Sequence, residues 1–144
     1  MLQESQFRQL QSESMRHVRE VDLTHKRYLY SQINWDARLI GIRGARGTGK
    51  TTLLLQYIKE HYADMSKVLY VTLDSFSFQL MTLYDVAEYA YTHGIDALFV
   101  DEVHYMLQWG QQIKRIFDSF ADLKIVYTGS SMLQIDEAQT DLSR

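Results

Sequence analysis

The glycine-rich segment at residues 44–51 has the residue types and spacing of a phosphate-binding loop. Its sequence, Gly-Ala-Arg-Gly-Thr-Gly-Lys-Thr, matches G-x-x-x-x-G-K-[ST] at every fixed position. Glycines let successive backbone N–H groups turn toward phosphate oxygens, and the helix that follows adds its own N-terminal N–H groups. Lys50 would contact the β- and γ-phosphates, and the Thr51 hydroxyl would bind Mg²⁺. The residues expected to hold the nucleotide are Gly44, Ala45, Arg46, Gly47, Thr48, Gly49, Lys50, Thr51 and Thr52.

Two adjacent carboxylates follow the apolar run Ala-Leu-Phe-Val at residues 97–100. A strand that is buried on both faces exposes polar groups at its carboxyl end, where ligands bind in open α/β sheets. We expect Asp101 to hold the hydration shell of Mg²⁺, and Glu102 to orient or deprotonate a water that attacks the γ-phosphate. Taken alone, the pair could equally be a helix N-cap and a first-turn acid. The phosphate loop upstream favours the site.

A second apolar strand ends in hydroxyl side chains, at Thr-Gly-Ser-Ser in residues 128–131. Ser130, or as second choice Thr128, could contact the γ-phosphate or the attacking water and so report which nucleotide is bound. The alternative is that these residues cap a turn or a helix. Asp74 is interpreted as a cap at the end of its strand and not as part of the site. His104 is interpreted as a structural histidine, and Trp109 as a residue of the apolar face of a helix.

The elements that must position these residues alternate in type along the chain. Apolar spacing predicts helices at residues 2–21, 51–61, 82–92 and about 109–120, and strands at 38–43, 68–73, 97–100 and 123–128. Strands separated by helices indicate the α/β class, with a mainly parallel sheet covered by helices on both faces. The phosphate loop then follows a strand and opens a helix, so a chance match is disfavoured. The pattern of the apolar patch at residues 28–33 does not decide between a helix and a strand.

Length and composition limit the classes of protein that remain. The chain has 144 residues, the size of one domain, and no cysteine, which excludes disulfides, thiolate metal sites and a cysteine nucleophile. A net charge of −3 gives no indication of nucleic-acid binding. No signal peptide or apolar run of about 20 residues is present, so we expect a soluble cytoplasmic protein without a membrane segment. The absence of an Asn-Lys-x-Asp guanine signature favours ATP over GTP.

Taken together, the phosphate loop, Asp101-Glu102 and the Thr-Gly-Ser-Ser segment, with Trp109 on the helix between them, resemble bacterial and archaeal AAA-type ATPases. More narrowly, they resemble the group in which an ATPase core precedes a C-terminal domain of unknown function. The resemblance covers roughly residues 27–144, which predicts an N-terminal helical segment at 1–26 and a P-loop ATPase core at 27–144. It also implies that the 97–100 and 123–128 strands lie between the other two.

The resemblance further implies parts that would lie beyond Arg144: a fifth strand, a helical lid with a second sensor, and an arginine finger supplied by a neighbouring molecule. The chain is therefore expected to be the N-terminal part of a longer protein, or a truncated one. Without the fifth strand, the 38–43 strand would lie at the edge of the sheet. We then expect association of two copies or instability, unless the patch at residues 28–33 folds over that edge.

Three functions fit the sequence. The leading hypothesis is binding and hydrolysis of Mg-ATP, with Glu102, Lys50 and Ser130 as catalytic residues and weak turnover in this segment alone. The second is a nucleotide-gated switch or scaffold with negligible turnover, whose output is the binding of a protein partner or of further copies. The third, a kinase for a small molecule, would usually lack the Asp-Glu pair.

Overall fold

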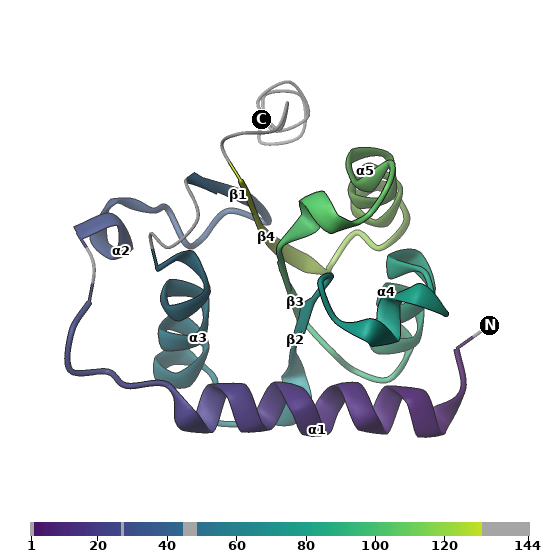
Figure 1. Ribbon diagram of the computed structural model, residues 1–144, viewed down its shortest axis with the longest axis horizontal. Coiled ribbons are helices and arrows are strands. Elements are labelled where there is room, and N and C mark those ends of the chain that lie inside the picture. The colour runs from purple at the N-terminus through teal and green to yellow at the C-terminus, as the bar shows by residue number, and fades with distance from the viewer. Residues whose placement is uncertain (1, 27, 45–48, 131–144) are drawn as a thin grey trace.

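Parallel strands and helices alternate through most of this chain, as the computed structural model shows (Figure 1). The structure describes residues 2–26, 28–44 and 49–130. The helices and strands, in chain order, are α1 (Glu4–Glu20), α2 (Tyr28–Gln32), β1 (Leu39–Gly44), α3 (Lys50–His61), β2 (Val68–Thr72), α4 (Leu83–Thr92), β3 (Ala97–Asp101), α5 (Trp109–Ser119) and β4 (Lys124–Ser130). Short 3-10 turns lie at η1 (Met65–Lys67), η2 (Phe76–Gln79) and η3 (Val103–Tyr105).

The strands form a parallel sheet in the order β1-β4-β3-β2. This is the α/β arrangement that the apolar runs predict, and the strand order is the one that the family resemblance implies. The register pairs Gly44 with Ser130 and Thr72 with Asp101. The carboxyl ends of all four strands therefore meet at one edge of the sheet, which we call the carboxyl edge.

Helices cover both faces of the sheet, α3 on one side and α4 with α5 on the other (Figure 1). Alternate residues of β3 supply the two cores, because successive side chains of a strand point to opposite faces. Leu98 and Val100 pack in the cluster with α4 and α5, and Ala97 and Phe99 pack in the cluster with α3. Every residue of β3 is buried, as expected for a central strand covered on both sides.

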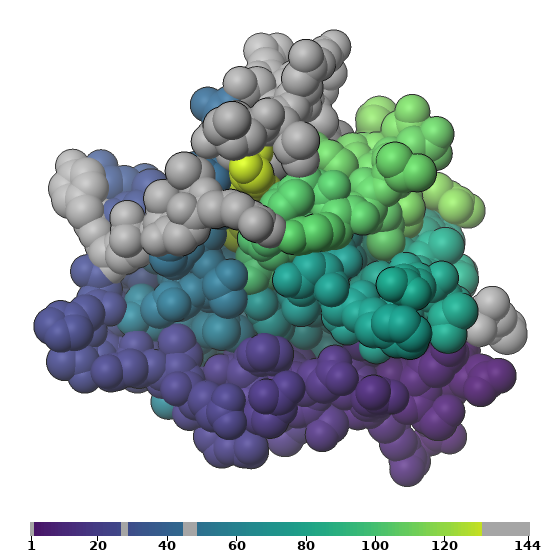
Figure 2. Space-filling view, viewed as in Figure 1, coloured from purple at the N-terminus to yellow at the C-terminus, as the bar shows by residue number. Residues whose placement is uncertain are grey.

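The first helix, α1, runs along the outer edge of β2, which is an edge strand of the sheet (Figure 1). Figure 2 shows α1, in purple, extending across the width of the molecule beneath the segments that belong to α3 and α4. Phe7 and Leu10 are buried in the cluster of α4 and α5, and Val18 is buried in the cluster of α3. Between them the Ser14 hydroxyl accepts a hydrogen bond of 2.9 Å from the backbone N–H of Tyr70 in β2.

The helix α1 thus closes the β2 edge and contributes to both cores. The division into a segment at 1–26 and a core at 27–144 stays a prediction. At the opposite edge of the described sheet, the side chains of Leu39, Ile40 and Ile42 in β1 are buried. Association of copies through that edge also stays a prediction.

The structure corrects several boundaries. The patch at residues 28–33 contains a short helix, α2. Tyr30 within this helix and Ile33 directly after it pack against the cluster of α3. The last strand extends to Ser130 instead of ending at residue 128, because it continues to pair with β1 as far as Gly44. The other elements lie within a residue or two of the predicted ranges. Within the described part of the chain, no helix has the length and apolar character needed to cross a membrane.

Candidate functional site

The Asp101 carboxylate is the centre of a hydrogen-bonded cluster at the carboxyl edge. Its residue is 1% exposed, and three hydroxyl groups of the described residues donate to it. Thr51 and Tyr70 donate to Oδ2, the latter at 2.7 Å, and Thr128 donates to Oδ1. A buried carboxylate is costly unless its oxygens accept hydrogen bonds. The three donors come from α3, β2 and β4, so they fix Asp101 relative to three neighbouring elements.

The helix α3 begins at Lys50, within the phosphate-loop motif, and carries three of the predicted site residues in its first turn: Lys50, Thr51 and Thr52. Gly49 precedes it with φ 83°, a left-handed conformation that glycine adopts without a steric penalty. Lys50 is buried, and its Nζ donates a hydrogen bond of 2.8 Å to the carbonyl of Gly44, where β1 ends. Lys50 therefore links the two ends of the loop. Thr52 is exposed, and Ala45, Arg46, Gly47 and Thr48 lie outside the described residues.

Glu102 follows β3 in a left-handed backbone conformation, with φ 60° and ψ 47°. Its backbone N–H donates a 3.1 Å hydrogen bond to the Thr128 hydroxyl, and its carboxylate Oε2 lies 3.6 Å from Nε2 of His104. The His104 Nδ1 in turn accepts a hydrogen bond from the backbone N–H of Ser130. Because Nδ1 accepts, the neutral ring carries its proton on Nε2, facing Glu102. Glu102 is partly exposed to solvent at the carboxyl edge, whereas the neighbouring Asp101 is buried.

Thr128 and Ser130 lie in β4 and are both buried. The Thr128 hydroxyl contacts both acids, since it donates to Asp101 and accepts from the Glu102 backbone. Thr128 therefore bridges the two acidic residues, and its contact to a γ-phosphate or an attacking water stays a prediction. Ser130 stands beside Gly44 in the register, and its role toward a nucleotide stays a prediction.

The sequence patterns missed one residue of this cluster, Tyr70, and gave a neighbouring residue, His104, a less specific interpretation. Tyr70 lies in the apolar run of β2, where a tyrosine resembles any other core residue. Burial, with the neighbouring Asp101 carboxylate as the next cause, raises the pKa of the Tyr70 phenol, so the phenol remains a proton donor. His104 is closer to Glu102 than its interpretation as a structural histidine implies.

Trp109 lies on α5 as its interpretation predicts, whereas the residue that caps η2 is Ser75 and not Asp74. Asp74 is exposed and accepts a 2.8 Å hydrogen bond from the Thr72 hydroxyl, as in a local turn. Trp109 is partly buried, and its ring packs 5.5 Å from that of Tyr127.

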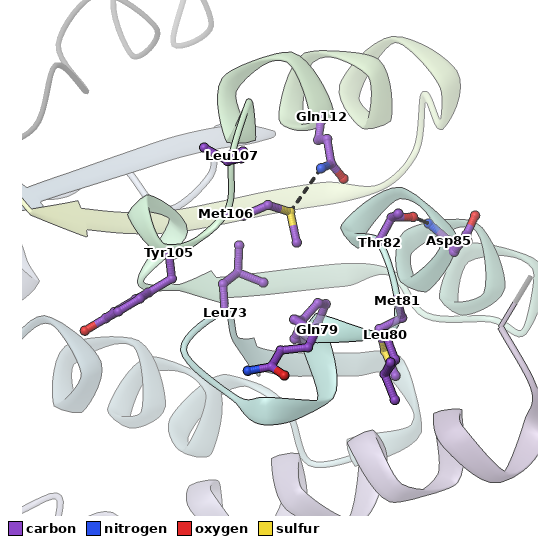
Figure 3. Close-up of a pocket in the computed structure, with 11 residues that line it drawn as sticks. Leu73, Gln79, Leu80, Met81, Thr82, Asp85, Tyr105, Met106, Leu107 and Gln112 are labelled. Atoms are coloured by element: carbon purple, nitrogen blue, oxygen red, sulfur yellow. Dashed lines mark hydrogen bonds between the residues drawn. The ribbon is translucent and has the colours of Figure 1, made fainter.

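A separate groove of about 630 Å³ lies between η2 and the turn that leads into α5 (Figure 3). It contains none of the residues predicted for the nucleotide site. Within it, the Gln112 amide donates to the Met106 sulfur at 3.1 Å. Most of its lining is apolar, and the full lining set is Leu73, Phe78, Gln79, Leu80, Met81, Thr82, Asp85, Tyr105, Met106, Leu107 and Gln112.

Comparison with known families identifies the fold that carries this cluster. A family model described as "AAA domain" matches residues 36–144. The chain belongs to the AAA domain family. The resemblance of its loop and strand ends to AAA-type P-loop ATPases is thereby confirmed. Among curated protein sequences, none matches the chain.

Two solved structures share the fold of this AAA domain. PCH-2 of C. elegans superimposes with a TM-score of 0.53 at 19% identity, covering 94% of this chain and 38% of that one. AMPPCP-bound DnaA from Aquifex aeolicus superimposes with a TM-score of 0.51 at 18% identity, covering 78% of this chain and 41% of that one. This chain therefore spans about two fifths of the length of either, and at such identities the likeness shows the fold alone.

The donor set of the AAA domain suits magnesium. Asp101 and Thr51 offer oxygen ligands, which Mg²⁺ prefers, and they are already hydrogen-bonded to each other. Within the described residues, no group of three or more His, Asp or Glu side chains is placed to hold a metal. Mg²⁺ characteristically binds through one or two protein ligands, with waters and substrate phosphates completing its shell. The residues present therefore fit an ion that arrives with a nucleotide.

Proposed function

We propose that this AAA domain binds Mg-ATP at the Gly44–Thr52 loop and hydrolyses it. The observation that carries this function is the hydrogen bond from the Thr51 hydroxyl to the Asp101 carboxylate. It joins the residue that follows the phosphate loop to the acid at the end of β3. These two segments are 50 residues apart in the chain, and both were singled out by their chemistry.

Lys50 and the N-terminus of α3 would bind the phosphates. The Lys50 ammonium group donates to the carbonyl of Gly44, the first residue of the motif, and would exchange this contact for a β- or γ-phosphate. The helix adds backbone N–H groups that have no partner within the helix itself.

Asp101 and Thr51 would hold magnesium, which neutralises charge that develops on the phosphates when bound. Asp101 would do so through metal-bound water, because Tyr70, Thr128 and Thr51 already surround its carboxylate. Glu102 would accept the proton of the attacking water, and Ser130 would contact the γ-phosphate or that water. The left-handed backbone at Glu102 turns this residue out of the line of β3 at the edge.

The contact between Glu102 and His104 favours one alternative. A glutamate that stays paired with His104 while nucleotide is bound would not activate water. The domain would then act as a nucleotide-gated switch or scaffold with negligible turnover. In either case we infer that an arginine from a neighbouring copy, or a protein partner, completes the site. The cytoplasmic location stays a prediction.

Thermal unfolding with Mg-ATP tests binding. Ligand at 100 times its dissociation constant stabilises the folded state by about 2.7 kcal/mol, or roughly 5–10 °C for a domain of this size. Lys50→Ala should remove this shift, and its melting temperature without nucleotide serves as the control for folding. An equal shift in the variant would refute the site.

Release of phosphate, measured without any added acceptor, separates hydrolysis from the alternatives. Glu102→Gln keeps the shape of the side chain but removes the base, so ATP binding should persist while turnover falls by ~10²-fold or more. A wild-type chain that binds Mg-ATP but releases no phosphate, with or without an added neighbour or partner, would favour the switch.

A further inference from the structure

Tyr70 connects the first helix of the chain to the acid at the centre of the site. We propose that Tyr70 is a positioning residue for the Asp101 carboxylate, and that α1 in turn holds Tyr70 in place. The role rests on the proposed function, because it concerns how Asp101 meets a metal that comes with a nucleotide. It adds a residue and an element to which neither the sequence patterns nor the family match assigns a part.

The Tyr70 phenol decides which oxygen of Asp101 faces a metal. Its hydroxyl donates to Oδ2 at 2.7 Å, and Oδ2 also accepts from Thr51. Each carboxylate oxygen has two lone pairs, so these two donors occupy Oδ2. Among the described residues, Oδ1 accepts from Thr128 alone and keeps one lone pair for a metal-bound water. Without the phenol, Oδ2 would compete for that water and the carboxylate would be free to turn.

The other side of Tyr70 is held by α1. Its backbone N–H donates to the Ser14 hydroxyl at 2.9 Å, in a contact that is buried. The ring of Tyr70 meets the ring of His17 edge-on, with centroids 5.4 Å apart and planes at 61°. The residue itself is 3% exposed. Since β2 is an edge strand, α1 is the element that covers this side of Tyr70, and a displacement of α1 would release the tyrosine.

A phenylalanine would fill the same space without this link. Tyr70 belongs to the apolar cluster of α3, and Phe99 stands beside it in the register of β2 against β3. A hydroxyl group in such a setting costs stability unless it is hydrogen-bonded, and its described acceptor is the carboxylate of Asp101. The choice of a phenol here is therefore explained by Asp101 and not by packing.

The first experiment measures the Mg²⁺ concentration that half-saturates the ATP-induced thermal shift, in the full chain. Tyr70→Phe should raise this concentration about tenfold, the lower range for loss of a hydrogen bond to a charged group, while ATP binding without Mg²⁺ is unchanged. Tyr62→Phe is the matched control. Tyr62 also packs against the α3-side cluster, with its ring 6.2 Å from that of Phe99, but does not bond to Asp101.

A second pair of variants tests the part of α1. Ser14→Ala removes the acceptor for the Tyr70 backbone and should raise the Mg²⁺ requirement in the same direction, by about two- to threefold. Ser12→Ala, at an exposed serine of the same helix, should leave it unchanged. This pair also keeps the test decisive if Tyr70→Phe folds poorly.

The outcomes distinguish failure of the proposed function from failure of the positioning role of Tyr70. A wild-type chain that shows no Mg-ATP shift refutes the proposed function itself. A normal wild-type shift with an unchanged Mg²⁺ requirement in Tyr70→Phe refutes the positioning role alone. Equal effects of Tyr70→Phe and Tyr62→Phe, or a loss of ATP binding in the absence of Mg²⁺, would also refute it, since either result indicates general loosening of the core.

Discussion

The carboxyl edge of the sheet and the outer edge of β2 are built from opposite kinds of residue. At the carboxyl edge, Asp101 and Glu102 meet hydroxyl, imidazole and backbone groups, and nearly every contact is polar. Along β2, α1 buries the apolar side chains of Phe7, Leu10 and Val18, with Ser14 as its buried polar residue. The first region holds the polar groups of the proposed site and the second an apolar contact between α1 and the sheet, and Tyr70 belongs to both.

The difference implies that variants in the two regions should have separable effects. Substitutions under α1 should lower the free energy of unfolding and leave nucleotide affinity nearly intact. Substitutions at the carboxyl edge should do the reverse. Only residues in contact with Tyr70 should affect both, because additivity fails where residues share partners.

Phe7→Ala should have the largest effect on stability. Phe7 is 4% exposed, and its ring packs 4.6 Å from that of Tyr89 on α4. Truncating a buried phenylalanine to alanine costs about 3–5 kcal/mol, which urea denaturation can measure. ATP affinity of the folded fraction should stay within about twofold of wild type. A change below about 1 kcal/mol would show that α1 is not an integral part of the core.

Asp101→Asn should show the opposite pattern. The asparagine keeps the shape of the side chain but replaces one acceptor oxygen with a donor, so it cannot accept from Thr51, Tyr70 and Thr128 together as Asp101 does. The Mg²⁺ concentration needed for ATP binding should rise by about 10–100-fold, the range typical of groups around a metal. Titration of Mg²⁺ at constant ATP measures this. Equal loss of ATP affinity with and without Mg²⁺ would contradict the assigned role.

Ser14→Ala should lower stability by about 1–3 kcal/mol, because the buried N–H of Tyr70 loses its acceptor. Hydrogen exchange at the Tyr70 amide gives a local measure of the same loss and should accelerate more than exchange in β4. If exchange accelerates equally throughout the sheet, the hydroxyl contributes to α1 as a whole and not to the β2 edge.

Acid should have the smallest effect, through the contact of α3 with the segment that follows α1. The exposed Glu60 on α3 accepts hydrogen bonds from Lys26 and then Tyr30, and these hold the pKa of its carboxyl below the usual value. Because the pKa of Glu60 is lower in the folded state, its carboxylate contributes fully to the free energy of unfolding above the pKa of the unfolded chain, about 4.3. This contribution is lost as the pH falls through the lower pKa of the folded state. Stability measured from pH 6 to pH 3 should therefore fall slightly more in wild type than in Glu60→Gln. A large difference would mean that the exposed contacts of Glu60 contribute more to stability than surface ion pairs usually do.

The sequence was sufficient for the features that depend on local patterns. Apolar runs located β3 and β4, and the spacing of glycines, Lys50 and Thr51 located the start of α3. Parallel strands bring their carboxyl ends to one edge, so the sequence predicts that Asp101 and Thr128 lie near the loop.

Contacts between distant residues could not be predicted in the same way. The amphipathic pattern of α1 shows that one face is buried, but it does not tell which surface receives it. Tyr70 looks like a core residue until the register of β2 against β3 places its phenol at Asp101. The patch at residues 28–33 was too short for its period to decide between helix and strand.

Glu102 has a consequence for how such a domain evolves. A residue with a Cβ in the left-handed conformation costs roughly 1–2 kcal/mol relative to the right-handed one, and glycine avoids that cost. Random variants sorted only for resistance to heat would therefore favour glycine at this position and discard the carboxylate. Variants sorted for turnover of ATP would keep the glutamate and accept the lower stability. Under the proposed function, the glutamate at this backbone position exchanges some stability of the fold for the carboxylate that acts on water.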